Sequence, residues 1–268
     1  MNPTPVPDEF AEALGQARPR LGPLAARVLW YEAIGSTNDR ALAWAEGGAE
    51  EGCLVLADAQ SAGRGRLGRT WTSPPGAGIY ASLVLRPPPH AIGLLTMAAG
   101  LGVSEGIAAA TGLDTHVKWP NDVCAPGRVP RKLAGLLAEA GSAGDRVLHV
   151  VLGIGINVLP AAYPPDVAPR AASLEGELGR MVPRGLVLAE CLAALWSRYA
   201  MLSAGNERGV LADWRRRAAA TFGRRVEWDA PSGVRTGIAR DVDASGALVV
   251  AAESEVVRLM AGEVRWVE

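Results

Sequence analysis

The chain has 268 residues, of which 49% are hydrophobic and 21% charged, and its formal net charge is −1 at pH 7. This composition is typical of a globular protein with an ample core, built as one large domain or as a large and a small one. The near-neutral charge implies no general affinity for nucleic acid. The three cysteines are far apart in apolar contexts, so we expect buried free thiols in a reducing compartment: Cys53, Cys124 and Cys191.

The beginning of the chain carries acidic residues and no apolar stretch followed by a cleavage site, so no secretion signal is visible. The longest uncharged runs are interrupted by proline, glycine or polar residues, which argues against a membrane span. We therefore expect a cytoplasmic protein without membrane contact. Residues 1–27 are expected to form a loosely structured leader with one short helix, too short for a DNA-reading domain.

The first regular elements enclose a loop rich in glycine and arginine. A helix is expected from Ser36 or Thr37, both good N-caps, to Glu46, before two glycines. Apolar runs then predict strands at Cys53–Ala57 and Ile79–Leu85. Residues 63–71, GRGRLGRTW, lie between these strands, and we call them the arginine loop. Because glycine permits close approach of the main chain and arginine donates to phosphate or carboxylate, this loop is suited to anions.

The spacing of three glycines in the arginine loop also fits the dinucleotide-binding fingerprint, G-x-G-x-x-G. That fingerprint requires a helix to begin at the glycines, whereas the turn-forming residues 72–78 follow here. No G-x-x-x-x-G-K-[ST] string occurs, which excludes a Walker loop. A solvated hairpin loop with arginines facing water remains an alternative when the loop is considered alone.

The middle of the chain predicts a helix followed by four strands. Helical periodicity covers Leu94–Ala110, and short strands at His116–Trp119 and Asp122–Cys124 flank a Pro-Asn turn. The runs Leu133–Ala140 and Val147–Val158 predict a hairpin. The turn sequence KWPND at 118–122 places a cation, an amide and a carboxylate together, although an ordinary β-turn would have the same residues.

Polar or glycine positions recur at the ends of the predicted hairpin strands. Lys132 precedes the first strand, Gly135 lies inside it, and Asn157 follows a glycine-rich stretch at the end of the second. Glycine inside a strand often marks close approach by a ligand or by another backbone. Together with the arginine loop, these positions predict one polar site along the end of a sheet.

The last third of the chain changes in character after residue 222. Helices are expected at Leu186–Leu202 and Val210–Ala219, and Gly223–Glu268 contains four or five short strands separated by turns. We therefore expect a main domain at residues 28–221 and a small β-barrel at residues 222–268, with the boundary near residues 220–223.

The motifs together resemble those of biotin protein ligases. The residues that carry the resemblance are STN at 36–38, Gln60 with the arginine loop, KWPND at 118–122, RKLAG at 131–135, GIGINV at 153–158, GALVV at 246–250 and AGEV at 261–264. The resemblance implies an α+β fold, with helices on a mixed sheet as in class II synthetases, and an SH3-like C-terminal barrel. It also implies that biotin and Mg-ATP form biotinyl-5′-AMP, which a lysine of a biotin carboxyl carrier domain then attacks.

The resemblance also implies roles for individual residues. Catalysis is assigned to Lys132 with Arg64 and Arg66. The residues expected to bind biotin are Ser36, Thr37, Asn38, Gln60, Arg64, Gly65, Arg66, Lys132 and Gly135. Those expected to bind ATP or the adenylate are Arg66, Arg69, Trp71, Lys118, Asn121, Lys132 and Asn157. For Trp71 a place in the core is the competing interpretation. No metal ligand is assigned, and Asp122 is the nearest candidate for the Mg²⁺ that accompanies ATP.

Three other functions remain as alternatives. A lipoate or octanoate transfer enzyme would share the fold, but a thioester mechanism needs a nucleophilic cysteine, and no cysteine lies in a motif. A biotin-binding sensor would not need Lys132 and the arginines. A DNA-binding regulator is disfavoured because the chain has no room for a winged-helix domain. The expected partners are the carrier domain of acetyl-CoA carboxylase or a related carboxylase, with no nucleic acid, and a homodimer is possible.

Overall fold

A computed structural model describes residues 2–267 except 128, 145, 162, 219, 220, 232, 254 and 261–263. Its centre is a seven-stranded sheet in the order β1-β2-β3-β7-β6-β5-β4. Only β1 and β2 pair in parallel, and the other neighbours are antiparallel. The strands are β1 (Val28–Ile34), β2 (Leu54–Gln60), β3 (Gly78–Leu85), β4 (His116–Lys118), β5 (Asp122–Cys124), β6 (Lys132–Ala143) and β7 (Arg146–Asn157).

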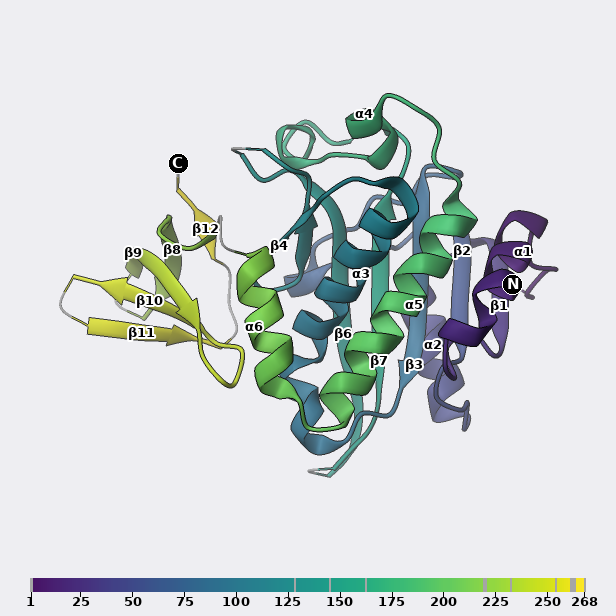
Figure 1. The fold of residues 1–268 in the computed structure, drawn as a ribbon, viewed down its shortest axis with the longest axis horizontal. Helices are drawn as coiled ribbons and strands as arrows, with labels where there is room; N and C mark the ends of the chain where they lie inside the picture. Colours follow the sequence, from purple (N-terminus) through teal and green to yellow (C-terminus); the bar gives the residue numbers. More distant parts are fainter. Residues whose placement is uncertain are drawn as a thin grey trace.

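Helices cover both faces of this sheet because its central strands are apolar on both sides. Leu54 and Leu56 of β2 belong to the core beneath α3 (Leu95–Thr111) and α5 (Arg184–Ser203), which lie side by side in Figure 1. The alternate residues Val55 and Ala57 face the opposite side and pack with α2 (Thr37–Glu46). The α+β layout expected from the sequence is therefore confirmed.

The segment before β1 differs from the expectation of a loose leader. It contains α1 (Asp8–Ala17), as expected, but Phe10, Leu14 and Leu24 are buried in the main core. The Phe10 ring lies 5.2 Å from the ring of Trp30, and α1 packs against α5 (Figure 1). Burial of these apolar side chains removes them from water and fixes the segment to the helical layer.

The C-terminal region forms a second sheet in the order β11-β10-β9-β8-β12. Its strands are β8 (Arg225–Ala230), β9 (Gly233–Val242), β10 (Leu248–Ala252), β11 (Glu255–Leu259) and β12 (Arg265–Trp266). The expected small all-β unit is present, but the described residues do not close it into a barrel, since β11 and β12 are outer strands without mutual pairing. Three residues of the AGEV motif and residues 219–220, beside the predicted boundary, lie outside the described residues, so the domain division stays a prediction.

Most predicted elements occur within a few residues of their expected limits. The strand β1, the short helix α4 (Leu174–Leu178) and the full length of the β6–β7 hairpin are additions. The stretch Pro89–Thr111 and the helix α5 are long and apolar enough to span a membrane, yet 72% and 50% of their respective apolar windows are buried within the protein. Their apolar character is explained by packing on the sheet and on each other.

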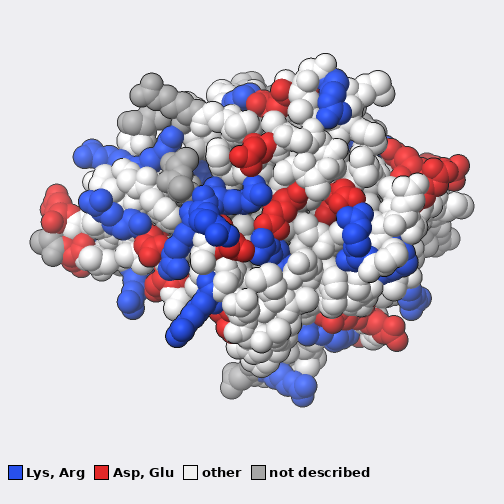
Figure 2. All heavy atoms as spheres, viewed as in Figure 1, with Lys and Arg blue, Asp and Glu red and all other residues white. Residues whose placement is uncertain are grey.

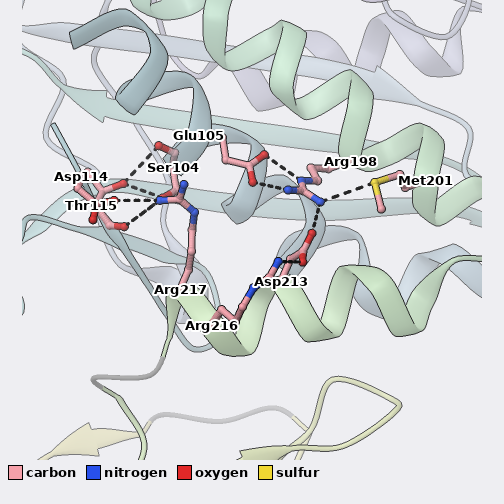
Figure 3. Close-up of polar contacts among 9 residues, drawn as sticks. All are labelled: Ser104, Glu105, Asp114, Thr115, Arg198, Met201, Asp213, Arg216 and Arg217. Atoms are coloured by element: carbon pink, nitrogen blue, oxygen red, sulfur yellow. Dashed lines mark hydrogen bonds and ion pairs between the residues drawn. The ribbon is translucent and has the colours of Figure 1, made fainter. Parts of the chain in front are cut away.

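The helix α6 (Glu207–Arg217) lies between the helical layer and the second sheet (Figure 1). Ion pairs join it to its neighbours: Arg198 of α5 hydrogen-bonds Glu105 of α3 and Asp213 of α6 (Figure 3). Arg217 donates to Asp114 and to the carbonyl of Thr115, each at 3.3 Å. Figure 2 shows basic and acidic side chains close together on this face. We call Arg198 and Arg217, together with their carboxylate partners, the helix-side arginine cluster.

Candidate active site

The topology of the main sheet brings the predicted site residues to one end. The end of β7 pairs with the start of β3 through Asn157 and Gly78, and the start of β6 lies beside it. β5 begins at the same end because Asp122 pairs with Gly135. β2 ends there too, since β2 and β3 are antiparallel neighbours. Antiparallel pairing therefore places strand ends that are up to about a hundred residues apart in the sequence on a common edge.

The arginine loop folds back on itself at this end of the sheet. Gly65 N–H donates to the carbonyl of Arg69 at 2.7 Å, and Trp71 N–H donates to the carbonyl of Gly63 at 2.9 Å. A Cβ atom at Gly63 would lie 2.4 Å from the Trp71 carbonyl, so only glycine fits there. Its tip is a single 3₁₀ turn, Arg66–Gly68, with no α-helix, which agrees with the rejection of the dinucleotide fingerprint.

A buried polar network begins at the N-terminus of α2. Ser36 is the N-cap residue, but its side chain makes no capping hydrogen bond. Instead, Oε1 of Gln60 accepts from the backbone N–H of Thr37 at 2.8 Å and from its hydroxyl at 3.1 Å. Nε2 of Gln60 donates to Ser73 at 2.9 Å, which fixes the orientation of the amide. Three buried or half-buried polar residues from three segments, Thr37, Gln60 and Ser73, are therefore held in one arrangement.

Ser82 of β3 extends this network beneath the helix. Its fully buried hydroxyl lies 2.8 Å from the Thr37 hydroxyl and 2.6 Å from Oδ1 of Asn38. A Cβ atom at Gly153 would lie 2.3 Å from the same Oδ1, so the glycine creates the space for Asn38. The predicted biotin-binding residues Thr37, Asn38 and Gln60 are thus brought together, and Ser82 connects them.

Two further glycines leave space for the side chain of Trp71. Gly135 and Gly155 pair across β6 and β7, and a Cβ atom at Gly155 would lie 2.5 Å from the Trp71 indole. A Cβ atom at Gly135 would lie 2.7 Å from Cε of Lys132 and 2.9 Å from Trp71. The indole Nε1 is buried and has no hydrogen-bond partner among the described residues. Because such a donor is costly to leave unpaired, it is suited to an acceptor on a ligand.

Lys132 and Lys118 flank one carboxylate. Nζ of Lys132 lies 2.6 Å from Oδ1 of Asp122 and 5.1 Å from the centroid of the Trp71 ring. Lys118 pairs with Asp122 in the β4–β5 register, and its pKa is lowered, chiefly because burial disfavours the charged form. Two cations and one carboxylate leave a positive balance, which favours an anionic ligand.

Arg66 lies at a cavity of about 260 Å³ beside this group. Burial lowers the pKa of Arg66, and the charge of Asp122 opposes that effect. The cavity is bounded by the arginine loop, the turn at 119–121, β6, the start of α3 and the turn at Ser245–Gly246 of the second sheet. Trp119 Nε1 donates to the carbonyl of Gly246 at 3.0 Å, which connects the two sheets. The amide of Asn121 donates to Leu136 at 2.6 Å at the same cavity.

Two of the predicted site residues, Arg64 and Asn157, make polar contacts within the protein. Nη2 of Arg64 forms ion pairs with Asp39 at 2.8 Å and Glu139 at 2.7 Å, on α2 and β6. The amide of Asn157 donates to the carbonyls of Ala172 and Lys132, so it holds the backbone at the start of β6. Among the described residues no group of three His, Cys, Asp or Glu side chains could hold a metal ion.

The sequence interpretation did not identify Ser82, Glu139 and Gly153 as members of the site. Neither Ser82 nor Glu139 belongs to a sequence motif. Ser82 lies inside an apolar strand, and Glu139 lies in the polar part of a predicted hairpin. Gly153 and Gly155 were noticeable as glycines in a strand, but the side chains that they accommodate come from distant segments. Only the β3–β7–β6 pairing reveals these contacts.

Comparisons with known proteins agree with this arrangement. Residues 30–157 match the model of the Biotin/lipoate A/B protein ligase family, and residues 221–265 match the Biotin protein ligase C terminal domain. A biotin protein ligase from Aquifex aeolicus in complex with biotin and ATP superimposes with a TM-score of 0.76 at 27% identity, over 90% of this chain and 98% of that chain.

Among curated proteins, the biotin–[acetyl-CoA-carboxylase] ligase of Mycobacterium tuberculosis is 40% identical over 239 residues, which are 86% of this chain and 85% of the relative. The chain spans 54% of the length of the bifunctional ligase/repressor BirA of Bacillus subtilis, with 38% identity over 180 residues.

The sheet, the polar network and the group of cations at the strand ends define a protein of the biotin and lipoate ligase class. The match of the C-terminal region and the identity to the mycobacterial ligase narrow this further: the chain belongs to the biotin protein ligase family.

Proposed function

We propose that this protein activates biotin with ATP and transfers it to a lysine of a biotin carboxyl carrier domain. The observation that supports this most is the convergence of two different environments at one end of the sheet. A buried network of neutral polar groups around Thr37 and Gln60 lies on the face of α2. Desolvated cations at Arg66 and Lys118 lie nearby around Asp122. A ligand with a polar ring at one end and a carboxylate at the other would meet both.

The neutral network binds the ureido ring in this proposal. Oε1 of Gln60 is already occupied by Thr37, so the amide presents an N–H group to a ligand carbonyl. The hydroxyl of Ser36 is not used for capping and can accept or donate. A site with fixed polar groups rejects ligands that would leave those groups unpaired, because an unpaired buried group costs about 1–3 kcal/mol.

The cations act on the first step. A carboxylate oxygen of biotin attacks the α-phosphorus of ATP, pyrophosphate leaves, and the mixed anhydride biotinyl-5′-AMP forms. Negative charge develops between the carboxylate and the α-phosphate, where Lys132 and Arg66 would stabilise it, since a preorganised donor of this kind is typically worth about 3 kcal/mol. Lys118, Asn121 and Arg69 would bind the remaining phosphates. Trp71 would cover the adenylate with its indole.

The site offers one carboxylate to Mg²⁺. Mg²⁺ is usually held by one or two carboxylates together with substrate phosphates, and Asp122 is one carboxylate beside the proposed phosphate position. When bound with ATP, the ion would supply charge neutralisation at the phosphates. Asp122 would contribute its ligand on the protein side and also orient Lys132.

In the second step the amine of the acceptor lysine attacks the acyl carbon, AMP leaves, and an amide bond forms. The arginine loop would keep water from the anhydride until the acceptor arrives. The acceptor is a carrier domain of acetyl-CoA carboxylase or a related carboxylase. A cytoplasmic location, the absence of nucleic acid as a partner and a possible homodimer stay predictions and add nothing to the mechanism.

The thiols argue against a thioester-forming octanoyl transferase. Burial raises the pKa of Cys124 to about 12, and it also raises the pKa values of Cys53 and Cys191. A thiol with a raised pKa is protonated at neutral pH and is a poor nucleophile. Cys124 is the one cysteine near Lys132, and its character therefore favours an adenylate over a thioester.

The test is the exchange of labelled pyrophosphate into ATP with biotin, lipoate or octanoate as the acid and no acceptor protein. Exchange that depends on biotin alone is the expected result. Exchange with lipoate or octanoate in place of biotin would contradict the substrate assignment. The absence of exchange with all three acids, together with tight biotin binding, would instead establish a binding protein.

A further inference from the structure

The ion pairs of Arg64 give this residue a different role from that of Arg66. Arg64 is the second residue of the arginine loop, and its Nη2 contacts Asp39 on α2 and Glu139 on β6. Arg66, two residues later, lies at the cavity beside Asn121. A guanidinium that donates to two carboxylates has its charge compensated, so it contributes little to an anionic ligand.

Glu139 connects the loop to the buried network. Its Oε2 accepts from Arg64 at 2.7 Å and from Nδ2 of Asn38 at 2.6 Å. Asn38 in turn accepts from the buried hydroxyl of Ser82 at 2.6 Å. One carboxylate therefore joins the glycine-rich arginine loop to the N-terminal end of α2 and, through Asn38, to the sheet.

We propose that Glu139 is a positioning residue, which holds the arginine loop over the α2 end of the site through Arg64 and orients Asn38 at the same time. Asp39 is the weaker second anchor, since its side chain is 60% exposed against 28% for Glu139. In this assignment Arg64 closes the site and does not take part in the reaction. The kinetic part of this inference rests on the proposed function, whereas the conformational part does not.

The variant Glu139→Gln removes the negative charge of this side chain and keeps its shape. Glutamine retains an oxygen that can accept from Asn38 but loses the charge that binds Arg64. The matched control is Glu190→Gln, which removes the charge from another arginine–glutamate pair, with Arg20, at the helical layer. Limited trypsin digestion of the ligand-free proteins, with cleavage sites identified by mass spectrometry, tests the position of the loop without any assumption about activity.

We expect Glu139→Gln to be cleaved after Arg64, Arg66 or Arg69 about fivefold faster than wild type and Glu190→Gln, with an unchanged melting temperature. In biotin-dependent pyrophosphate exchange, KM for biotin should rise about fivefold with kcat within twofold, and 0.5 M NaCl should narrow the difference by screening the pair in wild type.

Unchanged cleavage in Glu139→Gln would overturn the inference. A loss of kcat with unchanged KM would also overturn it, because Arg64 would then act on the reaction. Failure of exchange in wild type would contradict the proposed function, and the cleavage result would still decide the role of Glu139.

Discussion

The molecule contains two groups of arginines that differ in how their charges are balanced. In the helix-side arginine cluster, Arg198 hydrogen-bonds Glu105 and Asp213, and these partners raise its pKa (Figure 3). At the strand ends, burial lowers the pKa of Arg66 and of Lys118. The first group has carboxylates for its charges, while the second has desolvated cations in excess of nearby carboxylates.

In this protein, charge balance distinguishes the proposed site from the helix-side arginine cluster, whereas cavity size does not. The helix-side arginine cluster lines a cavity of about 360 Å³, larger than the one at Arg66. Its arginines are already paired, so an anion would have to displace acidic side chains. Perturbed cations in a cleft indicate function when no protein group compensates them, and they indicate structure when one does.

The largest expected effect comes from Lys132. Replacement by alanine removes the cation closest to Asp122 and Trp71, and adenylate formation should fall at least about a hundredfold. The fold should remain, since the side chain is partly exposed. Pyrophosphate exchange and circular dichroism provide the two measurements. Near-normal exchange in a folded Lys132→Ala protein would remove this residue from the site.

Arg198→Ala should have the opposite profile. It leaves Glu105 and Asp213 without their shared partner between three helices, and we expect a loss of about 2 kcal/mol in the free energy of unfolding. Urea denaturation measures this loss, and exchange activity in the folded protein should stay near wild type. A variant of normal stability but impaired exchange would mean that the helix-side arginine cluster belongs to the functional machinery.

Arg66→Ala should weaken retention of the intermediate. Loss of the half-buried guanidinium would remove its proposed contact to the adenylate phosphate, and we expect release of biotinyl-5′-AMP into solution to be about tenfold faster. Quenched samples analysed for free adenylate test this directly. Retention equal to that of wild type would place the phosphate away from Arg66.

The smallest expected effect is a change in the free energy of unfolding when Lys118 is replaced. Burial lowers the folded-state pKa of this lysine, so the charged form is disfavoured in the folded protein and the protonated lysine reduces stability. Lys118→Met should therefore gain about 1 kcal/mol at pH 7, while phosphate binding weakens. The gain should shrink as pH rises from the folded-state pKa towards the ordinary lysine pKa, because in this range the folded wild-type lysine is uncharged while the unfolded chain still binds a proton. Thermal unfolding at neutral and alkaline pH checks both signs.

Local sequence signals predicted much of the fold and part of the site. The helix α2 begins at an N-cap serine and ends at glycines, and α3 ends before Gly112 at φ +79°, so both could be located from local rules. The packing of α1 could not, because the apolar spacing of Phe10 and Leu14 does not show which element they contact. The strand order of the C-terminal sheet likewise depends on pairing that turns alone do not specify.

Within the site, the motifs identified residues but not their contacts. Lys132, Gln60 and Thr37 were predicted and lie at the expected end of the sheet. Glu139 was missed because it is seven residues beyond Lys132 on an ordinary hairpin. Its partners Asn38 and Arg64 come from two other segments. Pairwise contacts between distant segments arise from sheet register, which no single motif contains.

Hydrogen exchange with and without biotin and ATP tests the contrast between the two arginine groups most directly. We predict increased protection in residues 60–73 and 118–135, around the arginine loop and Lys132, with no change in residues 198–217 of the helix-side arginine cluster. Increased protection confined to residues 198–217, with the arginine loop unaffected, would contradict this prediction.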